Sequence, residues 1–320
     1  MIQLGNGILY ESEECSFRFD PRRVLPNDIS MISHAHTDHL PSSFKQSSVV
    51  CSAITKDFIK VRRKKDVEIV GHPRVKLMDA GHIAGSNMFL VKGEQDVLYT
   101  GDFCTREKRN TSGAKPHKCD ILITEATYGK PHYVFPDYDE IMSIVHDWLS
   151  DTIRRGGNAV LFAYPLGKSQ ELGAALKDMP IVFHQKIAEN NRVLRKHGYD
   201  LPADEYDHET TKSPMIYVTS GYGSDLARVE HLRKHGAKTA AFSGWALDRD
   251  FIRSSSVDEA FPVSDHCGFD ELTEFVKKCD PDRVFTTHGF AREFAMHIKK
   301  STGIEAQPMV SRQRTLDHFC

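Results

Sequence analysis

The segment Ser33-His34-Ala35-His36-Thr37-Asp38-His39-Leu40 constrains this chain more than any other feature of its sequence. It directly follows the apolar run Ile29–Ile32, which predicts a buried strand. Three imidazoles and one carboxylate within six residues at a strand end can converge on a metal ion, because both groups are good zinc ligands. An isolated His-x-His is more often a polar loop, but the longer pattern favours a metal site.

Two later loops offer further ligands. His82 lies in a glycine-rich loop after the predicted strand Val75–Met78, and Asp102 follows Gly101 after the predicted strand Val97–Tyr99. Each signal alone is weak, but in this order they supply what a dinuclear site requires. Such a site holds two ions ~3.5–4 Å apart and clamps the entering and leaving oxygens of a phosphoryl displacement.

Composition sets limits on the class of protein. The 320 residues include 42 Lys+Arg and 44 Asp+Glu, so the formal net charge is -2, and 40% of residues are hydrophobic. This composition indicates a globular chain of two domains or one large domain, and any nucleic-acid binding must rest on local basic patches. No apolar run reaches the ~18 residues of a membrane helix, and the seven Cys form no CxxC pair. We therefore expect a cytoplasmic protein with no membrane contact.

The texture of the chain changes near residue 135. The first ~130 residues read as short strands, which indicates a β-rich region. Helical periodicity then begins at Tyr138, and strands and helices alternate as far as Ser243, which predicts a parallel α/β sheet. A helix, a strand and a helix follow Phe261, whereas the polar stretch Tyr199–Pro214 predicts a loop.

The ligand motifs resemble those of the metallo-β-lactamase superfamily in kind and in order. The resemblance implies an α/β fold of the αββα sandwich type. It implies that one zinc ion is held by His34, His36 and His82. Asp38 and His39 would bind a second zinc, and Asp102 would bridge the two ions.

Three later motifs resemble the β-CASP group of this superfamily, whose members are nucleases acting on DNA or RNA. An acid and two histidines of that group match Glu125, His266 and His288, and Glu125 and His288 lie at predicted strand ends. The resemblance implies that His288 completes the second zinc site and that Glu125 and His266 form a hydrogen-bonded pair near the leaving group. A buried Glu–His pair can be tuned to donate a proton to a departing oxygen.

The likeness extends over nearly the whole chain. Four segments resemble compact exonucleases that are associated with DNA ligases in bacteria or grouped with RNA 3′-end-processing factors in archaea: Ala163–Glu171, Phe242–Trp245, Phe261–His266 and Gly303–Pro308. The expected organisation is a metallo-β-lactamase domain in two parts, residues 1–134 and 251–320, around an inserted β-CASP α/β domain at residues 135–250.

The resemblance implies a nuclease with two Zn²⁺ per chain, or Mn²⁺, that hydrolyses single-stranded nucleic acid. We expect a 5′-to-3′ exonuclease in DNA repair or processing, in association with a DNA ligase or helicase, with Asp38, Glu125 and His266 as catalytic residues. An RNA-processing exo- or endoribonuclease is the alternative, since a histidine at the position of His288 is the pattern of RNA-cleaving members. A small-molecule metallo-hydrolase is the second alternative, but it needs neither Glu125 nor His266.

Substrate contacts are harder to place. By analogy Ser264 and Arg106 are candidates for binding substrate phosphate. Two basic clusters, Lys60–Lys65 and Arg106–Arg109, are compatible with tracking a strand, although solvated surface is the commoner explanation. Arg106–Arg109 is the better candidate because its loop starts near the metal ligands. Gly167-Lys168-Ser169 lacks the first glycine of a phosphate-binding loop, and Cys104 and Cys267 are expected to be packing residues.

Overall fold

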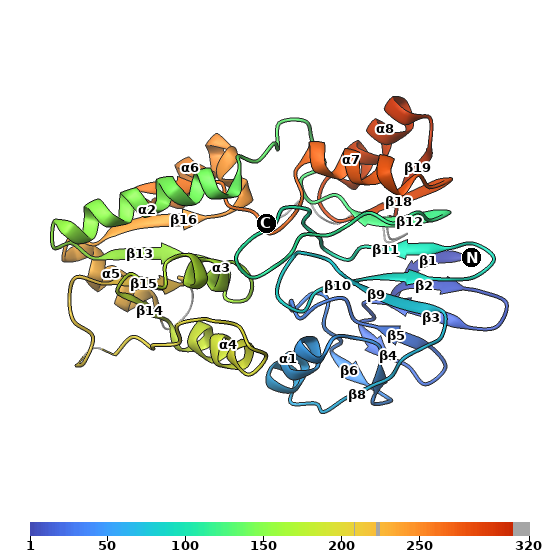
Figure 1. The fold of residues 1–320 in the computed structure, drawn as a ribbon, viewed down its shortest axis with the longest axis horizontal. Coiled ribbons are helices and arrows are strands. Elements are labelled where there is room, and N and C mark those ends of the chain that lie inside the picture. The colour runs from blue at the N-terminus through green and yellow to red at the C-terminus, as the bar shows by residue number, and fades with distance from the viewer. Residues whose placement is uncertain (208, 222–224, 310–320) are drawn as a thin grey trace.

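The computed structural model describes residues 1–207, 209–221 and 225–309. Within these residues, three sheets of four or more strands are present, together with two short two-stranded sheets. Figure 1 shows two sheets stacked in one half of the molecule and the third, with its helices, in the other half.

The first sheet has the strand order β1-β2-β3-β5. Its strands are β1 (Ile2–Gly5), β2 (Gly7–Glu11), β3 (Ser16–Phe19) and β5 (Ile29–Met31), and the flanking two-stranded sheets pair β4 (Arg23–Val24) with β6 (Ser43–Phe44) and β7 (Ser48–Val49) with β8 (Glu68–Ile69). Buried and partly buried residues alternate along β3, so one face of this sheet turns to the core.

The second sheet has the order β19-β18-β12-β11-β10-β9. Its strands are β9 (Val75–Asp79), β10 (Asn87–Val91), β11 (Val97–Tyr99), β12 (Ile121–Glu125), β18 (Arg283–Thr287) and β19 (Glu305–Pro308). The central strand β12 is buried at every residue, because it is covered on both faces.

Apolar side chains join the two sheets and the outer helices into four layers. Phe17 and Phe19 of the first sheet pack with Phe89 and Tyr99 of the second. On the opposite face of the second sheet lie α7 (Phe269–Cys279) and α8 (Ala291–Thr302), which bury Phe275 and Phe294. Phe58 and Ile59 of α1 (Ala53–Arg63) share an apolar cluster with Ile32, directly after β5, and with Val24 and Val49 of the two short sheets. The result is the αββα sandwich expected from the sequence.

The other half of the molecule is built on a parallel sheet of order β14-β15-β13-β16-β17, as the strand–helix alternation predicts. Its strands are β13 (Ala159–Phe162), β14 (Ile181–Phe183), β15 (Ile216–Thr219), β16 (Lys238–Phe242) and β17 (Glu259–Phe261). Its helices are α2 (Tyr138–Arg154), α3 (Lys168–Ala175), α4 (Gln185–Arg195), α5 (Leu226–Lys234), the 3-10 turn η2 (Gly244–Leu247) and α6 (Arg249–Ser255). β17 pairs with β16 of this sheet although it lies beyond the predicted boundary at residue 250. The division into domains stays a prediction.

Two helices that the sequence did not indicate connect the halves. α1 begins at Ser52, whose hydroxyl accepts a hydrogen bond from Thr55 N, and its basic last turn is favoured at a helix carboxyl end. Phe58 and Ile59 of α1 share an apolar cluster with Val193 and Leu194 of α4. This contact packs the sandwich against the inserted half below the metal loop.

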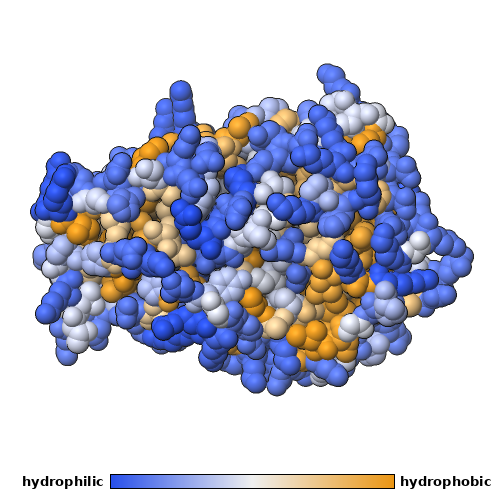
Figure 2. Space-filling model, in the orientation of Figure 1, coloured by the Kyte–Doolittle hydropathy of each residue, from blue (hydrophilic) through white to orange (hydrophobic). Residues whose placement is uncertain are grey.

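Figure 2 shows a mostly hydrophilic face in which hydrophobic residues gather in separate patches. Among the described residues, no helix has the length and apolar character needed to cross a bilayer. Between Tyr199 and Pro214, residue 208 aside, the chain forms no helix or strand and makes one isolated bridge, from Glu205 to Phe183.

Candidate metal centre

The loops that leave β5, β9, β11 and β18 meet at one edge of the sandwich. Each of two groups places its ligand atoms within 4.8 Å of one another: His34, His36, His82 and Asp102, and His39, Asp102 and His288. The first group is fully buried, whereas the second includes the exposed His288. The structure therefore brings together six of the seven side chains that the sequence proposed as ligands, and Asp38 lies beside them.

Hydrogen bonds fix the orientation of the three buried imidazoles. They join His34 Nδ1 to Ser33 Oγ (2.9 Å), His36 Nε2 to Leu166 O (2.8 Å) and His82 Nδ1 to Asp265 O (2.8 Å). The opposite ring nitrogens are left to face one another, and His82 Nε2 lies 3.1 Å from His36 Nδ1. His34 Nε2 is buried without a hydrogen-bond partner, which is the state of a nitrogen directed at a metal.

Asp102 lies between the two groups. Its Oδ2 is 3.7 Å from His34 Nε2 and 3.4 Å from His39 Nε2, and its Oδ1 is 3.5 Å from His288 Nδ1. Oδ1 is buried and accepts no hydrogen bond. The preceding Gly101 has φ +55, and a Cβ there would lie 2.8 Å from Ser33 Cβ. Glycine therefore allows the loop to bring this carboxylate between both histidine groups.

Burial keeps the first histidine group neutral. Desolvation lowers the pKa of His34 and of His82 well below the ordinary value, and neighbouring histidines lower them further. Desolvation by burial also lowers the pKa of His36, to about 4. Metal ligands must be deprotonated, so these rings are ready to bind an ion at neutral pH. The donor set, its buried unpaired atoms and its neutral imidazoles fit a divalent cation.

Asp20 is a site residue that the sequence analysis missed. Its Oδ2 accepts hydrogen bonds from His39 Nδ1 (2.7 Å), Ser33 Oγ (2.6 Å) and Tyr99 Oη (2.7 Å). Burial lowers the pKa of His39, but the carboxylates of Asp102 and Asp20 raise it by more than burial lowers it. The pKa of His39 is therefore well above its usual value. Asp20 thereby fixes the His39 ring with Nε2 toward Asp102. Its only sequence signal is an acid directly after β3.

The site opens to solvent on one side. The Asp38 side chain is 75% exposed, with Oδ2 3.7 Å from His39 Nε2, and the His288 side chain is 47% exposed. His288 and Gly289 both have positive φ, and a Cβ at Gly289 would lie 2.4 Å from Thr127 Cα. This tight turn after β18 brings His288 next to Asp102 and His39. The side of the centre with Asp38 and His288 is therefore the one that is open to solvent.

Glu125 and His266 form a pair next to the metal ligands. His266 Nδ1 lies 2.8 Å from Glu125 Oε1, which also accepts a hydrogen bond from Phe103 N. Thr127 N and Oγ1 donate to the other oxygen of Glu125. Burial lowers the pKa of His266, but the charge and hydrogen bond of Glu125 raise it, and the net change is upward. The donors around Glu125 fix its carboxylate, which holds His266 with Nε2 as the nitrogen able to exchange a proton.

The two residues proposed for substrate phosphate, Ser264 and Arg106, make hydrogen bonds within the protein, and their phosphate role stays a prediction. Ser264 Oγ is buried, donates to His266 O and accepts from His266 N. Arg106 donates to Ser264 O (3.2 Å), His266 O (2.7 Å) and the Glu271 carboxylate. Both therefore hold the loop that carries His266. Cys104 and Cys267 are fully buried and belong to no ligand group of the described residues.

A buried ionic cluster supports the same loop. Asp265 Oδ2 lies 2.8 Å from Lys168 Nζ, and Asp265 Oδ1 lies 3.6 Å from Lys108 Nζ. Burial raises the pKa of the Asp265 carboxyl, but the two ammonium groups lower it by more, so it stays ionised. Lys108 also donates to His82 O (3.1 Å). The cluster ties the inserted half, through Lys168, to two loops of the metal centre.

Comparisons with known proteins agree with this geometry. Residues 259–307 match a family described as "Zn-dependent metallo-hydrolase RNA specificity domain". A "Probable DNA ligase" of Opitutus terrae is 35% identical over 298 residues, which are 88% of this chain and 29% of that protein. "Probable RNase MJ4" of Methanocaldococcus jannaschii is 25% identical, covering 90% of this chain and 86% of that one.

Two further matches add to this picture. "DNA cross-link repair protein SNM1" of Arabidopsis thaliana is 24% identical over 80% of this chain and 60% of its own length. A solved structure of a protein of unknown function from Enterococcus faecalis superposes with a TM-score of 0.62 at 11% identity, covering 98% of this chain and 97% of the other. The low identity of that pair makes it a likeness of fold alone.

Sandwich, ligand cluster and relatives together define a metallo-hydrolase fold with an inserted α/β unit. The chain belongs to the metallo-β-lactamase superfamily, in its β-CASP nuclease group. It spans 29% of the length of the Opitutus ligase, so that ligase contains a large part with no counterpart in this chain. The buried His/Asp cluster fits metal binding, as the family description implies.

Proposed function

We propose that this chain is a metal-dependent phosphodiesterase that hydrolyses single-stranded nucleic acid. The observation that carries the proposal is the buried Asp102 between two histidine groups, with the Glu125–His266 pair at its side. Relatives of the chain are named as RNases and as a DNA repair protein, which supports nucleic acid as the substrate class.

Two divalent cations, with Zn²⁺ first and Mn²⁺ second, fit the two ligand groups. His34, His36, His82 and Asp102 would hold one, and Asp38, His39, Asp102 and His288 the other. When bound, such a pair supplies a hydroxide at neutral pH and balances charge on the phosphate oxygens.

The chain's own residues supply positioning and proton transfer. Asp20, Ser33 and the carbonyl of Leu166 orient the ligand rings, so their free nitrogens need no rearrangement. Glu125 stabilises a protonated His266, whose Nε2 then donates to the leaving oxygen. Asp38, exposed at the open side, orients the attacking water.

The finer proposal is a 5′-to-3′ exonuclease of DNA repair or processing, working with a DNA ligase. Its support is the 35% identity to part of a protein described as a DNA ligase. An RNase is the second candidate, favoured by the RNA specificity domain at residues 259–307 and by His288. End-labelled single-stranded DNA and RNA, each with and without a 5′-phosphate, separate the two through the product ladder.

The first test is the double change Asp38→Ala and His39→Ala. We expect bound metal to fall by one ion per chain, phosphodiesterase activity to be lost, and the circular dichroism spectrum to be retained. Metal content is measured by mass spectrometry of the dialysed protein, with exposed Asp66→Ala as the matched control. Unchanged hydrolysis by the double variant after chelation would contradict the metal assignment.

A further inference from the structure

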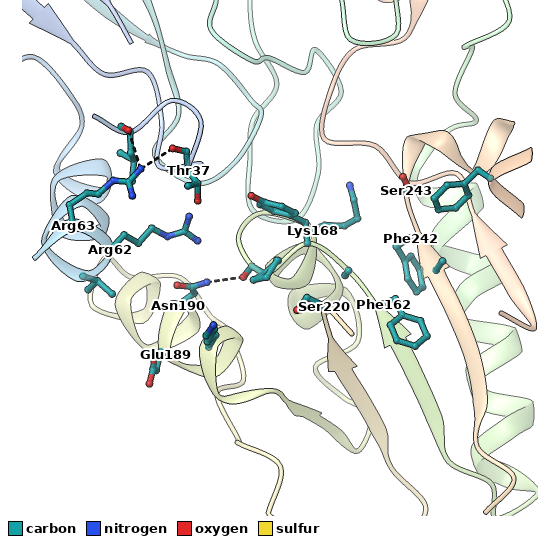
Figure 3. A pocket seen from close by; sticks show the side chains of 18 residues that line it. Thr37, Arg62, Arg63, Phe162, Lys168, Glu189, Asn190, Ser220, Phe242 and Ser243 are labelled. Atoms are coloured by element: carbon teal, nitrogen blue, oxygen red, sulfur yellow. Dashed lines mark hydrogen bonds between the residues drawn. The ribbon is translucent and has the colours of Figure 1, made fainter. Parts of the chain in front are cut away.

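A cavity of about 750 Å³ lies beside the metal loop, between the two halves of the molecule (Figure 3). One wall comes from Thr37 and the end of α1, and the other comes from the carboxyl ends of β13 and β16 and from α4. Tyr164 links the cavity to the metal centre, because it lines the cavity and its ring meets His36 edge-on at 4.9 Å. The cavity therefore lies next to the metal loop, with Thr37 and Tyr164 at its border with the ligand residues.

Arg62 and Arg63 of α1 connect the cavity with the metal loop. Arg62 Nη1 donates to Ala35 O at 2.9 Å, and Arg63 Nη2 donates to Thr37 O at 2.9 Å and Leu40 O at 3.1 Å. These carbonyls belong to the segment that carries His36, Asp38 and His39. Each guanidinium has five N–H donors, so these bonds use only part of its capacity. Both side chains line the cavity, and Figure 3 shows Arg62 extending toward it, while Arg63 turns to the metal loop at Thr37.

The charge of the lining favours an anion. Arg62, Arg63 and Lys186 line the cavity against a single acid, Glu189, while the ammonium of Lys168 is held by Asp265. Burial lowers the pKa of Arg62, but an arginine stays cationic at neutral pH. A planar guanidinium also matches two phosphate oxygens at once, which an ammonium does not.

The facing wall is aromatic. Phe162 lies across the cavity from α1, and Phe251 and the half-exposed Tyr164 line the same space, whereas Phe242 behind them is 4% exposed and packs in the core on Phe261. The guanidinium of Arg233 lies 5.8 Å from the centre of the Phe162 ring. Aromatic faces opposite arginines suit a ligand that alternates flat bases with phosphates, since stacking of a base on an aromatic ring contributes ~1–3 kcal/mol.

We propose that Arg62 and Arg63 bind the phosphates that neighbour the scissile phosphate of a nucleic-acid strand. Through their hydrogen bonds to the metal loop, this binding is coupled to the position of the metal-ligating side chains. The bases of the same nucleotides then lie toward Phe162 and the half-exposed Tyr164. This inference rests on the proposed nuclease function and names the part of the substrate that this cavity takes. It also separates the basic run 60–65 into two classes, since Lys60 and Lys64 do not line the cavity.

The matched pair of double variants is Arg62→Gln with Arg63→Gln, and Lys60→Gln with Lys64→Gln. Both remove two positive charges from the same helix end, so general electrostatic attraction changes equally. Affinity of the zinc-loaded protein is measured by fluorescence anisotropy with a labelled phosphorothioate strand of about 12 nucleotides, in DNA and RNA form, over a salt series. Hydrolysis of bis(p-nitrophenyl) phosphate is followed in parallel.

We expect the arginine pair to weaken strand binding by about tenfold or more, and to reduce the slope of log K against log salt by about 0.7 for each phosphate that is no longer neutralised. The lysine pair should keep Kd and slope within about twofold of the parent. The double variant Arg62→Lys with Arg63→Lys keeps the charge but not the planar guanidinium. Its affinity for the strand should lie between the affinities of the two glutamine pairs.

Equal weakening by the arginine and lysine pairs would overturn the inference and leave the proposed function standing. Failure of the parent protein to hydrolyse either the strand or the small diester, with Zn²⁺ or Mn²⁺, would instead overturn the proposed function. Thermal melts identify a glutamine variant that does not fold. In that case the double variant Arg62→Lys with Arg63→Lys tests the proposal, and a strand affinity and salt slope equal to those of the parent protein would count against it.

Discussion

Two basic segments of this chain look alike in sequence and have opposite surroundings in the fold. In Arg106–Arg109, the Lys108 side chain is fully buried and the Arg106 side chain is 17% exposed, and both bond to loops of the metal centre. At the end of α1, Arg62 and Arg63 line the open cavity, and the Lys60 side chain is 63% exposed. Two cations of the segment nearer to the metal ligands in sequence, Arg106 and Lys108, are thus the ones turned away from solvent.

The difference shows that the number of charges near a site does not say what they bind. A cation in a loop between packed layers meets carbonyls and carboxylates of its own chain, and its desolvation must be offset there. A cation at an exposed helix end keeps part of its donors for a ligand. The hydrogen bonds of Arg106 and Lys108 therefore favour a positioning role for these two residues, and the phosphate-binding role proposed for Arg62 and Arg63 rests on this contrast.

The largest effect is expected from Lys108→Met. The change removes one of two ammonium groups next to the buried Asp265 and the bond to His82 O. Breaking a buried ion pair from one side costs about 3–5 kcal/mol, so the free energy of unfolding in urea should fall by about that amount. Lys118→Met, which breaks an exposed pair with Asp280, should cost less than about 1 kcal/mol. Equal losses in the two variants would contradict a structural role for Lys108.

Arg106→Ala is expected to have the next largest effect, and on activity more than on stability. It leaves the carbonyls of Ser264 and His266 and the Glu271 carboxylate without their guanidinium partner. A shift of about 1 Å in a catalytic group can cost 10²-fold, so kcat for bis(p-nitrophenyl) phosphate should fall by about that factor. Arg109→Ala is the control, because the Arg109 side chain is 53% exposed and pairs with Asp139 at the surface. Loss of strand affinity with kcat unchanged would instead return Arg106 to a phosphate-binding role.

The smallest effect is expected from Lys60→Gln and Lys64→Gln. Lys60 pairs with Asp66 at 3.5 Å, but both side chains are exposed by more than 60%, and such pairs contribute little. Thermal and urea unfolding should change by less than about 0.5 kcal/mol for each change. A loss above about 1 kcal/mol would mean that this helix end is held together by its lysines and would weaken the contrast between the two segments.

Much of the candidate metal centre could be predicted because the residue types themselves, histidine and aspartate, are common metal ligands. Few arrangements other than metal binding use His34, His36, Asp38 and His39 after a buried strand, and the structure places these side chains next to His82, Asp102 and His288. Asp20 could not be predicted, since its role depends on Tyr99, Ser33 and His39 converging from separate segments. A single acid after a strand carries no signal of that convergence.

The fold was predictable where periodicity is strong. The alternating half was predicted as a parallel sheet, and strand pairing confirms it. α1 was missed because its few apolar residues, with Phe58 and Ile59 buried, lie among lysines and arginines that mask the pattern. β17 was missed because its three residues gain their structure from pairing with β16, which no local window shows.

The sequence by itself predicted the candidate ligands, and through the resemblance of their motifs the sandwich with its inserted α/β unit and the family, because residue types and their order along the chain carry that information. Only the tertiary structure decided which cations line the cavity, which carboxylate orients His39, and where the cavity lies. Those properties depend on burial and on distances between segments far apart in sequence. The charge of a side chain is local information, but its partner is fixed by the fold.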